Sequence, residues 1–186
     1  TFNKGIDVHR FNRLMGQFIN QILERHRHWN IILFPNTPQD VVVLGLLMSI
    51  IDEKYRREQV IIAPFISHGQ QAIEAVFDLK KMCSCIIGTR FHTNVCSIGM
   101  NIPTIGLAVH EQISSLYTEL NLAERCVKVD NEQFVDALFD QLSGSMENLE
   151  GIKKNYRFVQ RELEYQSDAY YEKLKLWLFS IPLLSG

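Results

Sequence analysis

The sequence lacks concentrated positive charge, and it has no apolar run long enough to cross a membrane. Lys and Arg number 19 against 21 Asp and Glu, for a formal net charge of -2, and the basic residues form only short groups. Nucleic-acid binding needs a basic patch, so we expect no nucleic-acid partner. The longest apolar run, residues 41–51, is too short for a membrane helix and predicts a buried helix instead.

Cysteine is scarce and follows no metal-binding pattern. The four cysteines include no C-x-x-C pair, and no histidine stands at zinc-ligand spacing from them. We therefore predict buried free thiols in a reducing compartment, with no metal and no cofactor. No secretory leader is visible, so the predicted location is cytoplasmic. The apolar tail, residues 176–184, is expected to dock on the core; alternatively it packs on an absent domain or places the protein at a membrane surface.

The chain instead alternates regularly between helical and strand patterns, in 186 residues of which 46% are hydrophobic. Strands are predicted at 31–34, 60–63, 83–87, 104–109 and 126–129, and helices at 8–29, 41–54, 70–82, 92–100, 110–120 and 132–142. Continuous apolar strands separated by helices indicate a parallel sheet covered on both faces. We predict an α/β fold for residues 1–144: a Rossmann-like three-layer domain with a mostly parallel sheet of about five strands.

Residues 145–186 form a second unit, a long, charged and Tyr-rich helical segment. We expect it to pack on the outside of the first unit or on a missing N-terminal domain, with the Gly-Ser-Met stretch 144–146 as a candidate hinge. In open parallel sheets, ligands bind at the carboxyl ends of the strands. Three of the six histidines fall in those loops, namely His68, His92 and His110. Asn36, in a Pro-Asn-Thr-Pro turn, is a further candidate, although turn formation alone explains it equally well.

The stretch 86–93, Ile-Ile-Gly-Thr-Arg-Phe-His-Thr, carries the clearest chemistry. Gly88 ends a strand and permits a tight turn or close backbone approach. Arg90 follows where a helix begins, and the free amides of a helix start together with a guanidinium make an anion site. His92 can exchange a proton near neutral pH. Alternatively, Arg90 forms an ion pair across the domain and His92 caps its helix.

This stretch, with the downstream stretch 96–107 (Cys-Ser-Ile-Gly-Met-Asn-Ile-Pro-Thr-Ile-Gly-Leu), resembles the polysaccharide pyruvyl transferase family. C-terminal halves of that family carry a hydrophobic strand ending in G-x-R-x-H, a helix of small apolar residues, and then G-x-P-x-I. Residues 115–122 resemble the family's next helix. The close resemblance covers about residues 84–122, and the order of elements fits over 6–142.

The resemblance implies two Rossmann-like domains of GT-B-like architecture facing across a cleft, of which this chain is the C-terminal, donor-binding one. The implied reaction transfers a pyruvyl group from phosphoenolpyruvate to a saccharide acceptor, giving a pyruvate ketal. Arg90 would bind the donor's phosphate or carboxylate, and His92 would act as the general acid. Other substrate-binding candidates on the same loops are Gly88, Thr89, Phe91, Thr93, His68, His110 and Asn36.

One departure from the family's pattern concerns the loop after the G-x-P strand, where many relatives have a Tyr and a Lys. Here residues 108–112 read Ala-Val-His-Glu-Gln, and either His110 replaces the cation or the donor site is altered. Two other functions stay open. One is a GT-B glycosyltransferase or sugar-nucleotide enzyme, with Glu111 on the ribose. The other is a non-catalytic binding module.

Overall fold

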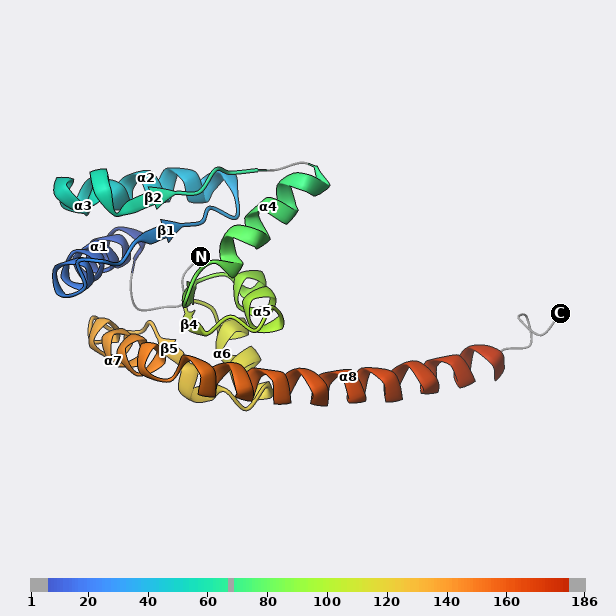
Figure 1. Cartoon of the computed structure of the whole chain (residues 1–186). Helices are drawn as coiled ribbons and strands as arrows, with labels where there is room; N and C mark the ends of the chain where they lie inside the picture. The colour runs from blue at the N-terminus through green and yellow to red at the C-terminus, as the bar shows by residue number, and fades with distance from the viewer. Residues whose placement is uncertain (1–6, 67–68, 181–186) are drawn as a thin grey trace.

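The computed structural model describes residues 7–66 and 69–180 and shows an α/β fold with a long C-terminal helix (Figure 1). Five short strands pair in parallel: β1 (Ile31–Leu33) with β2 (Val60–Ile62), and β3 (Ile86–Gly88) with β4 (Thr104–Ala108) and β5 (Cys126–Lys128). The predicted class and the parallel pairing are confirmed. The single sheet is not, because the strands divide into sheets of two and three that share no backbone ladder among the described residues.

Helices connect the strands in the order that the sequence predicts. They are α1 (Val8–Arg25), α2 (Pro38–Ile50), α3 (Glu53–Glu58), α4 (Gln70–Lys81), α5 (Phe91–Gly99), α6 (Glu111–Glu119), α7 (Phe134–Glu147) and α8 (Leu149–Ser180), with a short 3-10 turn at Ala123–Arg125. Positive φ angles of 60° at Asn101 and 54° at Asn121 end α5 and α6, as is common just beyond a helix. The predicted helix over 41–54 is two helices, α2 and α3.

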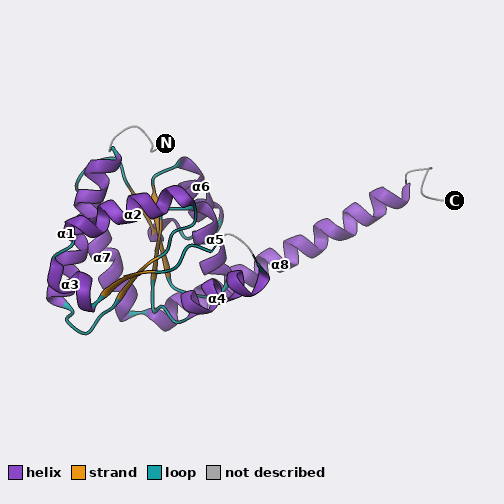
Figure 2. Ribbon diagram, turned by 90° about the horizontal axis from the view of Figure 1, so that it is seen from above, coloured by secondary structure: helices purple, strands orange, loops and turns teal. Residues whose placement is uncertain are grey.

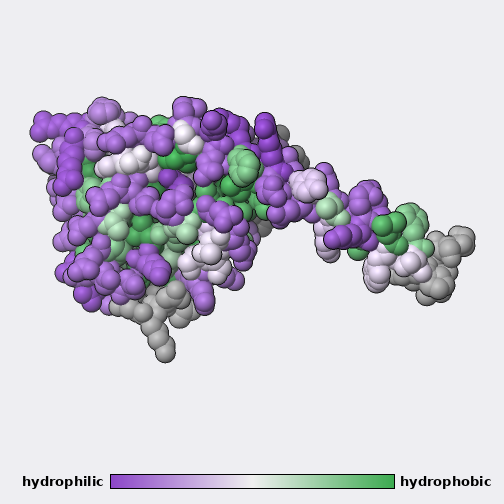
Figure 3. Space-filling view, turned by 90° about the horizontal axis from the view of Figure 1, so that it is seen from below, coloured by the Kyte–Doolittle hydropathy of each residue, from purple (hydrophilic) through white to green (hydrophobic). Residues whose placement is uncertain are grey.

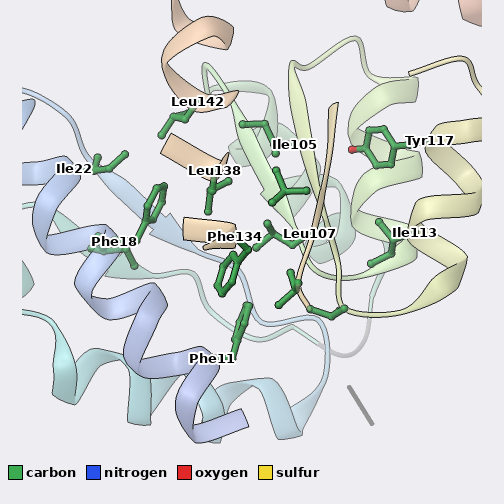
Figure 4. Close-up of a cluster of buried hydrophobic side chains, with 14 of the residues drawn as sticks. Phe11, Phe18, Ile22, Ile105, Leu107, Ile113, Tyr117, Phe134, Leu138 and Leu142 are labelled. Atoms are coloured by element: carbon green, nitrogen blue, oxygen red, sulfur yellow. The ribbon is translucent and has the colours of Figure 1, made fainter. Parts of the chain in front are cut away.

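The hydrophobic core lies where α1 and α7 face the central strand β4, with α6 on the other side of that strand (Figure 4). Phe11 stacks on Phe134 with their ring centroids 5.7 Å apart, and Phe18 meets Phe139 edge to face. All five residues of β4 are buried, as expected for the middle strand of a parallel sheet. Gly106 in β4 leaves room for the Tyr117 ring, which would lie 2.3 Å from a Cβ at that position.

Residues 41–51 were predicted to form a buried helix, but helix α2 is only partly buried. Its apolar residues run around all sides, but only Leu47 is buried, while Val41, Val42 and Leu46 are exposed. The helix packs against α1 on one side and lies at the outside of the fold on the other (Figure 2). An all-round apolar helix is usually covered on every side, so this surface is uncommon for a monomeric domain.

A buried polar cluster fixes the start of α8 against β4. The Tyr156 hydroxyl accepts a hydrogen bond from the Thr104 amide (3.2 Å) and donates one to the Thr104 carbonyl (3.1 Å). Arg125, 6% exposed, donates through Nε to that carbonyl (2.9 Å) and to the Tyr156 hydroxyl (3.0 Å), and through Nη2 to Ser145 (3.1 Å). A buried guanidinium needs such partners, and here it holds the strand, α7 and α8 together.

Beyond this anchor, α8 leaves the domain. Ile152, Tyr156 and Val159 are its buried residues, and from residue 161 onward the helix is exposed almost throughout. It extends well past the rest of the fold (Figures 1 and 2). We call residues 161–180 the α8 arm. The expected docking of residues 176–179 on the core is therefore wrong, and residues 181–184 lie outside the described residues.

The arm carries many exposed aromatic and aliphatic side chains. Figure 3 shows apolar patches on it between charged residues. Its exposed apolar residues are Leu163, Tyr165, Tyr170, Tyr171, Leu176, Trp177, Leu178 and Phe179. The predicted hinge at 144–146 is also wrong, because those residues lie inside α7 and the helices break at Asn148.

No helix within the described residues is both long enough and apolar enough to span a bilayer. The four cysteines are free and half-buried. Burial raises the pKa of the Cys85 thiol to about 11 and that of Cys126 to about 11. These two thiols are therefore almost fully protonated near neutral pH, which makes them poor nucleophiles and poor metal ligands.

The buried cluster predicts that Tyr156→Phe destabilises the fold by about 1–3 kcal/mol, because the Thr104 amide loses a partner inside the protein. Tyr170→Phe on the exposed arm is the matched control and should change the free energy of unfolding by less than about 0.5 kcal/mol. Urea unfolding measures both. Equal effects of the two substitutions would contradict the anchoring role of Tyr156.

Candidate functional site

The loop that joins β3 to α5 carries the predicted site residues and is held from beneath by Asn94. Asn94 is fully buried, and its amide nitrogen donates to the carbonyls of Gly88 (3.2 Å) and Arg90 (2.8 Å). Its amide oxygen accepts from the Tyr117 hydroxyl (2.8 Å). Gly88 ends β3 and is buried, because the Asn94 side chain fills the space that a Cβ would take. This backbone turn is thus fixed by side chains from two helices.

Arg90 stands at the N-cap of α5, at the carboxyl edge of the three-stranded sheet. Its Nη2 donates to Asp40 in an ion pair that joins this loop to α2. The first turn of a helix has amides without intrahelical partners, so this position combines a cation with free donors. The guanidinium side chain keeps 45% of its surface exposed, and several of its five N–H groups remain available to a ligand. The predicted ion pair across the domain exists without burying Arg90.

Asp40 reaches Arg90 because it belongs to a capping box at the start of α2. Thr37 is the N-cap and accepts from the Asp40 amide (3.3 Å), while Asp40 Oδ2 accepts from the amides of Asn36 and Thr37 (both 3.0 Å). Partial burial alone would raise the pKa of Asp40, but the Arg90 guanidinium and these amides hold the pKa below its usual value. Asp40 is therefore a charged group that orients Arg90.

A second contact joins the same two loops. Thr93, buried in the first turn of α5, donates through its hydroxyl to the Asn36 side-chain oxygen (3.1 Å). Asn36 follows β1, and Thr93 follows β3, so the contact bridges the carboxyl ends of two strands that belong to different sheets. Ligands of open α/β folds usually bind outside the carboxyl ends of the strands, which is where this contact lies.

His92 is exposed in the first turn of α5 and meets the Phe91 ring edge to face, with centroids 5.8 Å apart. It lines a pocket of about 250 Å³ together with Asn36, Thr93 and Lys80, which we call the α4–α5 pocket. Its remaining walls are the Cys96 side chain of α5 and aromatic and aliphatic side chains from the loops after β1 and β2 and from α4. His92 does not cap its helix, since the N-cap is Arg90.

The other predicted residues are less closely grouped. Thr89 is half-buried between Gly88 and Arg90, and Phe91 is 38% exposed. His110 is the N-cap of α6 at the carboxyl end of β4, half-buried, and it is not among the residues that line the α4–α5 pocket. His68 lies outside the described residues. A larger hollow of about 640 Å³ runs beside β5 and α7, and none of the predicted site residues line it.

Three residues of this site were not predicted from the sequence: Asp40, Asn94 and Lys80. The Thr37-to-Asp40 spacing is a recognisable capping-box signal, which places Asp40 at a helix start but not beside Arg90. Asn94 and Lys80 carry no local signal, because their roles come from contacts that only the folded chain creates.

The Asp40–Arg90 pair predicts a pH dependence of stability. Because the pKa of Asp40 is lowered on folding, its contribution is present above the unfolded value of about 3.9 and is lost as the pH falls through the folded value. Asp40→Asn should therefore be less stable than wild type at pH 7 by about 1 kcal/mol and lose less stability between pH 7 and pH 3. Thermal unfolding across this range measures both, with Asp140→Asn at an exposed position in the middle of α7 as the control. A parallel pH profile for Asp40→Asn and wild type would contradict the pair.

The Asn94 contact predicts opposite effects of two glycine substitutions. Gly88→Ala places a Cβ 2.6 Å from the Asn94 side-chain oxygen and should destabilise the fold by about 1–3 kcal/mol, because that amide cannot move without losing its partners. Gly99→Ala, at the end of α5 with nothing within 4 Å of its Cβ, should stabilise by up to about 1 kcal/mol. Chemical denaturation of both variants measures the change in the free energy of unfolding. A Gly88→Ala variant as stable as wild type would contradict the close approach of the Asn94 side chain to Gly88.

Comparison with known proteins bears on what this loop does. No curated protein matches the chain. Among protein families, the polysaccharide pyruvyl transferase family matches residues 6–111, more than half of the 186 residues and a span that includes the loops carrying Asn36, Arg90 and His92. That match agrees with the resemblance found in the strand, loop and helix around Gly88. The chain belongs to the polysaccharide pyruvyl transferase family.

Proposed function

We propose that this chain binds the donor in a reaction that transfers a pyruvyl group from phosphoenolpyruvate to two hydroxyls of a saccharide. The observation that carries the proposal is the position of Arg90 at the N-cap and of His92 in the first turn of α5. Both are exposed at the carboxyl edge of a parallel sheet, next to a small pocket. Family membership supports a transferase acting in polysaccharide synthesis. The donor and the ketal product are our own proposals.

In this mechanism Arg90 binds an anionic group of the donor, and Asp40 keeps the guanidinium in place. His92 gives a proton to the methylene carbon, so that positive charge develops at the carbon bearing the phosphate. One saccharide hydroxyl adds to that carbon, the bond to the phosphate oxygen breaks, and the second hydroxyl closes the ketal. The hydroxyl protons restore His92 and leave with the phosphate. Arg90 opposes the negative charge of the leaving phosphate.

The α8 arm supports a second part of the proposal, a partner domain across a cleft. Its exposed aromatic and aliphatic side chains do not contact the described domain, and such a surface suits packing against another folded unit. We propose an N-terminal Rossmann-like domain as that unit, with the saccharide acceptor bound between the two. The fragment alone is then expected to bind donor without turning it over.

His92→Ala is expected to lower kcat by about 10²–10⁴-fold, the usual contribution of general acid catalysis. Arg90→Ala should mainly weaken donor use and so lower kcat/KM. The assay follows phosphate release and ketal formation from phosphoenolpyruvate by the intact protein. His9→Ala on α1 and Arg56→Ala on α3, both exposed, are the matched controls and should keep wild-type rates.

Activity that survives both substitutions at Arg90 and His92 would overturn the mechanism. Thermal shifts with nucleotide sugars, and none with phosphoenolpyruvate, would instead favour a glycosyltransferase. Such an enzyme would use Glu111, the exposed first residue of α6, on the nucleotide ribose.

A further inference from the structure

Lys80 is a buried cation without an acidic partner. It lies in the last turn of α4 and is 5% exposed. Its ammonium lies 5.7 Å from the ring centroids of Phe34 and of Phe77. Within residues 7–66 and 69–180, it has neither a hydrogen bond nor a carboxylate within 4 Å. Surrounding an ammonium mostly with apolar groups and without such a partner is costly, and two aromatic rings compensate only part of the cost.

Lys80 also lines the α4–α5 pocket, on which His92, Thr93 and Asn36 converge. None of the described residues that line this pocket is acidic, so Lys80 makes its interior electropositive. The volume of about 250 Å³ lies just below the roughly 300–1,000 Å³ of pockets for drug-sized ligands, which suits a small metabolite. The pocket also offers hydrogen-bond donors beside the charge of Lys80, namely the side-chain amide of Asn36 and the imidazole of His92.

The two cations of this region differ in their surroundings. Arg90 is paired with Asp40 and is 45% exposed, whereas Lys80 is buried and unpaired. Burial lowers the pKa of Lys80, while the nearby thiols of Cys96 and Cys83 act in the opposite direction. A ligand anion in the pocket would favour the charged ammonium, and its charge would be felt strongly because the walls are apolar.

We propose that Lys80 is a ligand-binding residue that holds a phosphate or carboxylate group of a small substrate inside the α4–α5 pocket, beside His92. Naming phosphoenolpyruvate as that substrate rests on the proposed function; the anion site itself does not. The proposed site takes its cation from α4 instead of from the loop after β4, and it explains why a lysine is tolerated among aromatic rings.

The test is binding of phosphoenolpyruvate and of inorganic phosphate to the intact protein, measured by calorimetry. Lys80→Met keeps the length of the side chain and removes the charge, and it should weaken binding of both probes by at least about 30-fold. Lys80→Arg keeps the charge and should retain binding within a few-fold. Lys81→Met is the matched control: Lys81 is the exposed neighbour of Lys80 and bonds only Asp78 on the surface (3.0 Å).

Stability gives an independent readout. Removing an unpaired buried charge should raise the midpoint of thermal unfolding of Lys80→Met by about 2–4 °C without ligand, whereas a merely structural lysine would give a decrease. Unchanged binding in Lys80→Met, equal losses in the Met and Arg variants, or no binding of either probe to wild type would each overturn the anion site. Binding that depends on Lys80 without ketal formation by wild type would support this site and reject the proposed function.

Discussion

The geometry of the candidate site depends on one buried group, the side-chain amide of Asn94. Asn94 ties the carbonyls of Gly88 and Arg90 together and is itself held by the Tyr117 hydroxyl, so the turn between β3 and α5 cannot relax independently of α6. Burial raises the pKa of Tyr117 far above neutrality, which keeps its hydroxyl proton available to the amide. Because Arg90 and His92 follow directly, their backbone positions are set by a fully buried side chain. Pre-organisation of this kind is what precise substrate positioning requires.

Local signals in the sequence predicted most of the fold. Gly88 ends β3, and continuous apolar runs placed all five strands within a few residues. The predicted start of α2 at residue 41 is three residues late, because Thr37 and Pro38 resemble turn residues although they are the N-cap and the first residue of the helix. The start of β3 was placed too early because Cys83 looks like a strand residue, yet its amide donates to the Lys80 carbonyl and closes the last turn of α4. The division into two sheets could not be predicted, since pairing between strands depends on tertiary packing rather than on the composition of either strand.

The candidate site, like the fold, could be predicted only in part from the sequence. Arg90 and His92 are recognisable because the strand end, the helix start and the basic side chains lie within a few consecutive residues. Asp40 lies 50 residues before Arg90, and the sequence indicates only that it caps a helix. Lys80 lies 10 residues before Arg90, and the sequence indicates only that it belongs to the charged end of a helix. Their contribution arises only when α2 and α4 are placed against α5. The loop 108–112 has no lysine, and in the proposed anion site the cation comes from α4 instead.

The α8 arm should make a docked partner detectable by amide hydrogen exchange. Its 20 residues from 161 to 180 correspond to about 30 Å of helix with almost no tertiary support. Isolated helices of this length are marginal in water, so the arm should exchange between helix and coil from its far end inward, while the turns around Tyr156 stay closed. Whatever docks on the arm must also order it. The gradient of amide hydrogen exchange along α8 then records the presence of a partner, independently of any chemistry at Arg90.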